Sequence, residues 1–157
     1  MKENIDKARR AFFLLLKYTR QNHIPLDCQV DLFVKTIDPI LTYGAEVWGL
    51  SSDLKIIERV HLFALKRFLN VTIRTPNILV YGETGRYPLS VNVYVKCVRY
   101  WLRIQKMEPD RLPFKAYKML KHMMEQNRNN WASSVCFLLY RYGFGDVWLG
   151  LVNGWLG

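Results

Sequence analysis

Four basic side chains recur at helical spacing between residues 89 and 107, and the chemistry open to them is the neutralisation of phosphate. They are Lys96, Arg99, Arg103 and Lys106. At 100° per residue, this i, i+3, i+7, i+10 spacing places all four within an arc of about 80° on one side of a helix. Cations held so close repel one another unless an anion meets them. A sugar-phosphate backbone supplies such anions, and each phosphate contact adds affinity without reading the base sequence.

A solvated helix face is the alternative interpretation of this stripe. The stripe contains no acidic residue, which is unusual for a surface that only faces water. Apolar residues centre on the opposite side of the same segment and predict a buried face there: Tyr94, Cys97, Val98, Trp101 and Ile104. Nucleic-acid contact and a plain solvated surface both stay open for this helix.

Three other segments carry cations opposite an apolar face, each less cleanly. The cations are Arg9, Arg10, Lys17 and Arg20 in residues 3–21; Lys55, Arg59 and Lys66 in residues 54–70; and Lys115, Lys118, Lys121 and the adjacent His122 in residues 113–126. In residues 54–70 and 113–126, each stripe taken alone is more often an ordinary polar helix surface. Whether several of them line one groove depends on the tertiary structure.

The composition points to an anionic partner. The chain has 157 residues, with 23 Lys and Arg against 13 Asp and Glu, a formal charge of +10 and a pI of about 9.7. Half of the residues are hydrophobic and 14% are aromatic, which excludes a disordered chain. The charge is uneven, because residues 25–58 hold two basic and six acidic residues. Nucleic acid is the first partner that this predicts, and an acidic membrane surface the second.

We expect no membrane span, because the longest run without Asp, Glu, Lys or Arg covers only residues 129–140, far short of the roughly 20 that a spanning helix needs. The N-terminus has no apolar signal core, and the three cysteines, Cys28, Cys97 and Cys136, are odd in number and far apart. These features favour an intracellular location, nuclear or cytoplasmic, with reduced thiols.

The sequence lacks the common catalytic and metal-binding motifs. It contains no Asp-Asp pair, no G-x-x-x-x-G-K loop, no G-x-S-x-G elbow and no H-E-x-x-H helix. Asp27 and Asp31, at i, i+4, are most simply an acid-rich helix N-terminus. The three histidines stand at no metal-ligand spacing, so a zinc site would need ligands from distant parts of the chain. We therefore predict no catalytic residue, no metal site and no cofactor.

Apolar residues follow helical spacing along almost the whole chain, so the predicted fold class is all-α, a bundle of about six to eight helices without a substantial sheet. Caps, prolines and glycines predict helices over about residues 3–21, 26–37, 54–70, 89–107, 113–126 and 130–142. The second of these helices should kink or restart at Asp38-Pro39. A further short helix should begin at residue 76 and end at Gly82 or Gly85. The tail from residue 143 to 157 shows no convincing period. A boundary near residues 74–87 would divide the chain into subdomains 1–74 and 75–157.

Residues 39–49, with the sequence PILTYGAEVWG, resemble the segment downstream of the polymerase core in reverse transcriptases of non-LTR (LINE-type) retrotransposons. The block at residues 7–11, KARRA, supports the resemblance. Further blocks follow in the expected order at residues 57–71, 75–77, 80–89 and 142–148. The resemblance spans about residues 5–148.

This resemblance implies a helical thumb over residues 1–74 and a helical connecting region over residues 75–157 that is truncated at its C-terminus. A thumb grips the backbone of the template-primer duplex, which implies a role for Arg9, Arg10, Lys17 and Arg20. The palm and its two metal-binding aspartates are absent, and the missing fingers and palm are an expected partner. The PILTYGAEVWG block is interpreted as structural, with Gly44 allowing close helix packing, Trp48 anchoring a core and Glu46 holding a cation.

Two functions remain as hypotheses. The first is a non-catalytic fragment of a retroelement RNA-directed DNA polymerase that binds the backbone of a template-primer duplex or structured RNA. Its predicted nucleic-acid-binding residues are Arg9, Arg10, Lys17, Arg20, Lys55, Arg59, Lys66, Lys96, Arg99, Arg103 and Lys106. The second is a truncated transposon relic or protein-interaction module with no activity of its own, whose exposed apolar surface favours self-association.

Overall fold

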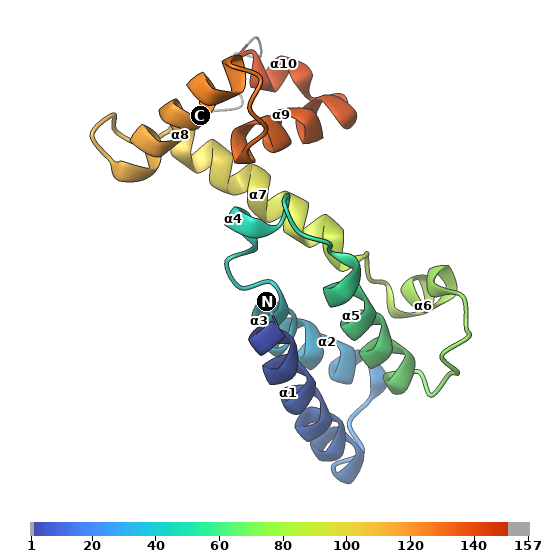
Figure 1. Cartoon of the computed structure of the whole chain (residues 1–157). Coiled ribbons are helices and arrows are strands. Elements are labelled where there is room, and N and C mark those ends of the chain that lie inside the picture. The colour runs from blue at the N-terminus through green and yellow to red at the C-terminus, as the bar shows by residue number, and fades with distance from the viewer. Residues whose placement is uncertain (1, 151–157) are drawn as a thin grey trace. The chain divides into compact units, whose positions relative to one another are not determined.

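The computed structural model describes residues 2–150, and all regular secondary structure within that range is helical (Figure 1). The helices are α1 (Lys2–Gln21), α2 (Leu26–Thr36), α3 (Asp38–Leu41), α4 (Ala45–Trp48), α5 (Lys55–Phe68), α6 (Asn77–Thr84), α7 (Leu89–Gln105), α8 (Leu112–Glu125), α9 (Trp131–Arg141) and α10 (Gly145–Trp148). Three of them, α3, α4 and α10, have only four residues. The all-α prediction is therefore confirmed for the described part of the chain.

The helices form two compact units. Within the described range, unit 1 comprises residues 2–44 and 53–93, and unit 2 comprises residues 45–52 and 94–150. This division differs from the expected boundary between residues 74 and 75. The reason is that Tyr81 of α6 and the first backbone nitrogens of α7 donate hydrogen bonds to Glu58 of α5, and Arg86, after α6, donates to Asp31 of α2.

Local signals explain where several helices begin and end. Gly85 has φ +61°, a left-handed conformation that favours glycine, and it caps the end of α6. Asn130 and Ser133 form a reciprocal capping box at the start of α9. Between α2 and α3 the chain restarts at Ile37, one of the two outcomes expected at Asp38-Pro39.

An aromatic cluster forms the core of unit 1, where α1 packs against α2, α3 and α5. Phe12 is 2% exposed, and its ring lies edge-on to three others, with centroid distances of 6.0 Å to Phe33, 5.9 Å to Phe63 and 5.4 Å to Phe68. Edge-to-face rings at these distances attract one another beyond their burial alone. Phe12 is therefore the residue that joins the core faces of three helices.

The core of unit 2 lies between α7, α8 and α9 and consists of Trp101, Ile104, Tyr117, Ala132, Val135 and Leu139. Trp101 donates a hydrogen bond of 3.2 Å from its indole nitrogen to the hydroxyl of Tyr117, and its ring stacks on Trp148 at 5.4 Å. Trp148 belongs to α10, a helix that lies in the tail where the sequence shows no period. Residues 151–157 of that tail lie outside the described residues.

The PILTYGAEVWG block contains a turn followed by the short helix α4. Gly44 has φ +66° and forms the turn before α4, which is why this position favours glycine. Glu46 takes part through its backbone carbonyl, which accepts a hydrogen bond of 2.9 Å from the indole nitrogen of Trp131. Trp48 is half-buried, and the indole of Trp131 binds this block through that hydrogen bond.

Cys97 of α7 contacts the same block and is fully buried in unit 2. Its thiol donates a hydrogen bond of 3.3 Å to the carbonyl oxygen of Ala45. Burial, together with the charge of Glu46, raises the pKa of the Cys97 thiol to about 11. Cys97 therefore stays a neutral thiol at physiological pH and acts as a small core residue.

Candidate nucleic-acid interface

The side of α7 opposite the core carries an exposed basic face. Arg99 and Arg103 are exposed, as is Lys106 in the turn directly after α7, whereas Cys97 and Trp101 are buried. The guanidinium of Arg103 lies 5.4 Å from the ring centroid of Tyr100, a cation–π contact that holds the arginine along the helix surface. Lys96, the first residue of the predicted stripe, is half-buried and has an interaction of its own. Three of the four predicted residues thus form the solvent-facing part of the stripe.

No acidic residue occurs anywhere in the seventeen residues of α7. The cations of α8 have a different environment: Lys115 lies 3.3 Å from Asp110, and His122 lies 3.5 Å from Glu125. At least Lys115 of the α8 stripe therefore has a counter-charge, as expected of a solvated helix surface. The basic face of α7 is the stronger candidate for an external anion.

In unit 1 the predicted cations of α1 are all exposed. They are Arg9, Arg10, Lys17 and Arg20. Arg10 donates from its Nε to the backbone oxygen of Asp6 at 3.3 Å. Lys7, which was not among the predicted site residues, forms an ion pair on α1, with its ammonium 2.7 Å from the carboxylate of Glu3.

On α5 the structure confirms exposure for two predicted cations and corrects the third. Lys55 and Arg59 are exposed, but Lys66 is only 8% exposed. Its ammonium donates a hydrogen bond of 2.9 Å to the carbonyl oxygen of Ile73. The turn after α5 folds back over Lys66, so this lysine ties down that turn and is not available to a backbone phosphate.

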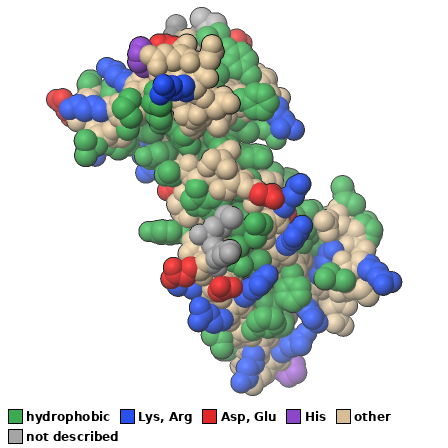
Figure 2. Space-filling model, in the orientation of Figure 1, with side chains coloured by type: hydrophobic (Ala, Val, Ile, Leu, Met, Phe, Trp, Pro, Cys, Tyr) green, Lys and Arg blue, Asp and Glu red, His purple; other side chains and the backbone are tan. Residues whose placement is uncertain are grey.

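Arg67 is the basic residue that sequence analysis missed. It is exposed, and its guanidinium lies 5.3 Å from the ring centroid of Phe63. The signal was present in the sequence, since Arg59, Phe63 and Arg67 follow i, i+4, i+8 spacing and must share one side of a helix. The predicted residues therefore form two groups, one on α1 and α5 in unit 1 and one on α7 in unit 2. Figure 2 shows Lys and Arg side chains interspersed with hydrophobic ones over unit 1.

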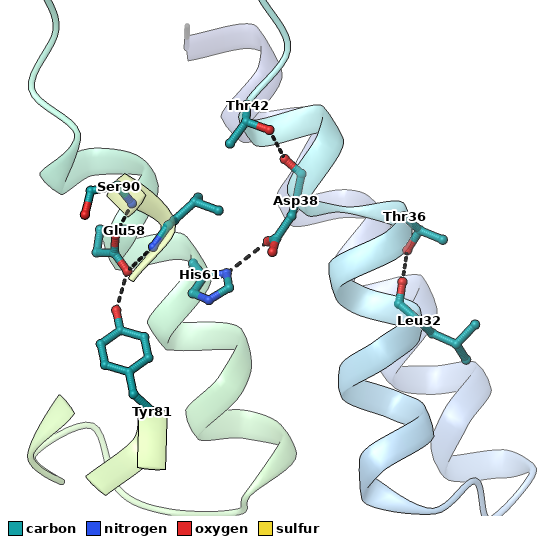
Figure 3. A network of polar contacts seen from close by, with 9 residues as sticks. Leu32, Thr36, Asp38, Thr42, Glu58, His61, Tyr81 and Ser90 are labelled. Carbon is teal, nitrogen blue, oxygen red and sulfur yellow. Dashed lines mark hydrogen bonds and ion pairs between the residues drawn. The ribbon is translucent and has the colours of Figure 1, made fainter. Parts of the chain in front are cut away.

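A buried polar network in unit 1 was also missed (Figure 3). Nδ1 of His61 lies 2.9 Å from Oδ1 of Asp38, and both side chains are buried. The ring of His61 stacks on Tyr81 at 6.5 Å, and the Tyr81 hydroxyl donates a hydrogen bond to Glu58. Burial and the contact with Glu58 raise the pKa of Tyr81 well above its usual value, so it remains a neutral donor. The contact between Asp38 and His61 joins α3 to α5, and the stacking of Tyr81 on the same imidazole joins α6 to them.

Glu58 also binds the start of α7. Its carboxylate accepts hydrogen bonds from the backbone nitrogens of Leu89 at 3.1 Å and Ser90 at 3.2 Å. These nitrogens belong to the first turn of the helix, where backbone N–H groups have no intrahelical partner and the helix dipole favours a negative charge. Glu58 thus acts as an N-terminal cap supplied from α5, 31 residues earlier in the sequence.

We expect Glu58→Ala to destabilise unit 1 by about 2 to 3 kcal/mol, because it leaves the Tyr81 hydroxyl and the first N–H groups of α7 without their acceptor. Urea denaturation followed by circular dichroism measures this free energy. The matched control is Glu83→Ala, which removes an exposed carboxylate from α6 and is expected to change stability by less than about 0.5 kcal/mol. Equal effects of the two substitutions would contradict the capping role.

Asp31 of α2 is an acidic residue of unit 1 that is paired with a residue outside its own helix. Arg86 donates a hydrogen bond to the carboxylate of Asp31, and Lys35 lies 3.6 Å from it one turn along α2. The contact with Arg86, followed by the charge of Lys35, holds the pKa of Asp31 below its usual value. Asp31 of the i, i+4 pair Asp27 and Asp31 thus forms an ion pair with Arg86.

Comparisons with known proteins gave no match to a family model, to a curated protein or to a solved structure. Among residues 2–150, no three His, Cys, Asp or Glu side chains are grouped so that they could hold a metal ion. Over that same range, no helix combines the length and the apolar character needed to cross a bilayer.

Proposed function

We propose that this chain binds the sugar-phosphate backbone of a nucleic-acid duplex, independently of base sequence, and catalyses no reaction by itself. The observation that carries the proposal is the exposed face formed by Arg99 and Arg103 of α7 and by Lys106 directly after its end. No acidic residue occurs within α7, and a packed core lies behind the helix. Rigid, closely spaced cations of this kind favour phosphate, because each contact releases condensed counterions.

The resemblance to non-LTR retrotransposon reverse transcriptases supports the same proposal. In that family the helices after the palm grip a template-primer duplex, so an RNA/DNA hybrid or structured RNA is the proposed ligand. Polymerisation would need fingers and a palm with its paired aspartates, and this sequence contains no Asp-Asp motif. We propose that the fingers and palm are the protein partner of this chain and that it acts in the nucleus or cytoplasm.

The test is equilibrium binding of the full chain to a labelled RNA/DNA hybrid over a series of salt concentrations. If about five phosphates are engaged, the logarithm of the association constant should fall against the logarithm of salt with a slope of roughly −4. The slope should be the same for hybrids of unrelated sequence. A flat salt response, or no binding near physiological salt, contradicts the proposal.

A protein-interaction module is the second candidate, and exposed apolar side chains in unit 1 favour it. Ile73, Ile78 and Tyr87 are 77%, 78% and 75% exposed, within fifteen residues of one another in the sequence. Such a surface predicts self-association that does not weaken with salt. Light scattering of the purified chain across the same salt series separates this function from backbone binding.

A further inference from the structure

Two helices of unit 1 carry the same row of residues, a phenylalanine with a cation one turn before it and one turn after it. On α1 the row is Arg9, Phe13 and Lys17; on α5 it is Arg59, Phe63 and Arg67. The i, i+4, i+8 spacing places each row along one side of its helix, over about 12 Å. All four cations are exposed.

The two rows meet at their aromatic residues. The ring centroids of Phe13 and Phe63 lie 6.4 Å apart in an edge-to-face arrangement. Phe63 also contacts Phe12, and this second ring contact packs α1 against α5. The guanidinium of Arg67 covers the Phe63 ring at 5.3 Å. Phe63 is thus in contact with both the ring of Phe13 and the guanidinium of Arg67.

Phe13 does not contribute fully to the core of unit 1, since 55% of its surface is exposed. An aromatic ring that projects among cations is a platform on which a flat, polyanionic ligand can stack. The nearest acidic residue on this side of α1 is Asp6, which lies one turn before Arg9 and Arg10. The surface therefore keeps an excess of positive charge on both helices.

We propose that these two rows form a binding site for single-stranded nucleic acid, in which an unpaired base stacks on Phe13 and the flanking phosphates pair with Arg9, Lys17, Arg59 and Arg67. This goes beyond duplex-backbone binding on α7, because it assigns base contacts to a different surface. Aromatic rings and guanidinium planes both stack bases without regard to sequence, and flanking cations follow the strand.

The geometry favours a base over a lipid surface. An interfacial helix inserts a whole apolar face, but the apolar face of α1 is buried in unit 1 through Ile5, Ala8 and Phe12. Leu14 and Tyr18 are exposed but lie about 100° and 140° further round the helix from Phe13. One projecting ring, beside a second ring that is already covered by arginine, matches the size of a single nucleobase.

The test compares binding of the full chain to oligo(dT) and to an abasic strand of equal length by fluorescence anisotropy at one salt concentration. The wild type should bind oligo(dT) more tightly than the abasic strand. Phe13→Leu should weaken oligo(dT) binding about 5- to 100-fold and leave the abasic strand unaffected, whereas Phe13→Trp should keep the preference for bases. Arg67→Gln should weaken both ligands, because it removes a phosphate contact as well.

Leu14→Ala is the matched control, and circular dichroism verifies that each variant is folded. Equal affinity of the wild type for the two strands, or an equal loss for both strands in Phe13→Leu, overturns the proposal. So does a loss of binding to phosphatidylserine vesicles in Phe13→Leu with oligo(dT) binding unchanged. If the chain binds the hybrid duplex with the expected salt slope but shows no base preference, this site is refuted. The proposed backbone binding by α7 is then unaffected.

Discussion

Arg99→Glu combined with Arg103→Glu is expected to weaken binding to an RNA/DNA hybrid by about 100-fold near physiological salt. The double substitution removes two phosphate contacts and places two carboxylates against the backbone. Both side chains are exposed, so the fold of unit 2 should persist, as circular dichroism can verify. Fluorescence anisotropy with hybrids of two unrelated sequences should show the same loss for each, because backbone contacts do not read bases.

The control for this variant reverses the same amount of charge elsewhere in unit 2. Lys115→Glu with Lys121→Glu changes two exposed residues of α8, one of which is already paired with Asp110. We expect that control to weaken hybrid binding by less than about 5-fold, because charges away from the contact are screened by salt. Similar losses in the two double variants would show that net charge, and not the face of α7, governs binding.

Phe12→Ala is expected to lower the free energy of unfolding of unit 1 by about 3 to 5 kcal/mol. The substitution empties the position at which Phe33, Phe63 and Phe68 converge, and the surrounding helices cannot fully close the cavity. The midpoint of thermal unfolding should fall by about 15 °C or more. Differential scanning calorimetry of the full chain measures both quantities.

Leu14→Ala tests the same helix without touching the core, because Leu14 is 71% exposed. Its effect on stability should stay within about 0.5 kcal/mol. Phe12→Leu should fall between the two, since it retains part of the buried volume. If Phe12→Ala proved no more harmful than Leu14→Ala, the aromatic cluster would not be what holds α1 in unit 1.

Features that depend on spacing along one helix were predictable from the sequence. The apolar positions of α1 and α7 recur at 3.6-residue spacing, which predicted both the helices and their buried sides, and Gly85 ends α6 because its left-handed conformation suits glycine. The exposure of Arg99 and Arg103 followed from the same geometry. Local chemistry decides these features, so no tertiary information was needed.

Features that depend on distant parts of the chain were not predictable. Helical spacing places Lys66 in line with Lys55 and Arg59, yet Lys66 is buried and donates to the carbonyl of Ile73 in the turn after α5. Nothing in the spacing around Glu58 distinguishes it from a surface acid, yet it caps a helix that begins 31 residues later. The spacing of Arg59, Phe63 and Arg67 was visible, but its partner row on α1 required the packing of the two helices.

The most direct test of backbone binding by α7 is the change in salt slope when its face is neutralised with Arg99→Gln, Arg103→Gln and Lys106→Gln together. Each phosphate contact contributes about 0.9 to the slope of log affinity against log salt, so the triple variant should bind a hybrid duplex with a slope shallower by roughly 3. A triple variant with the slope of the wild type would mean that these three residues touch no phosphate, and the proposed function would fail.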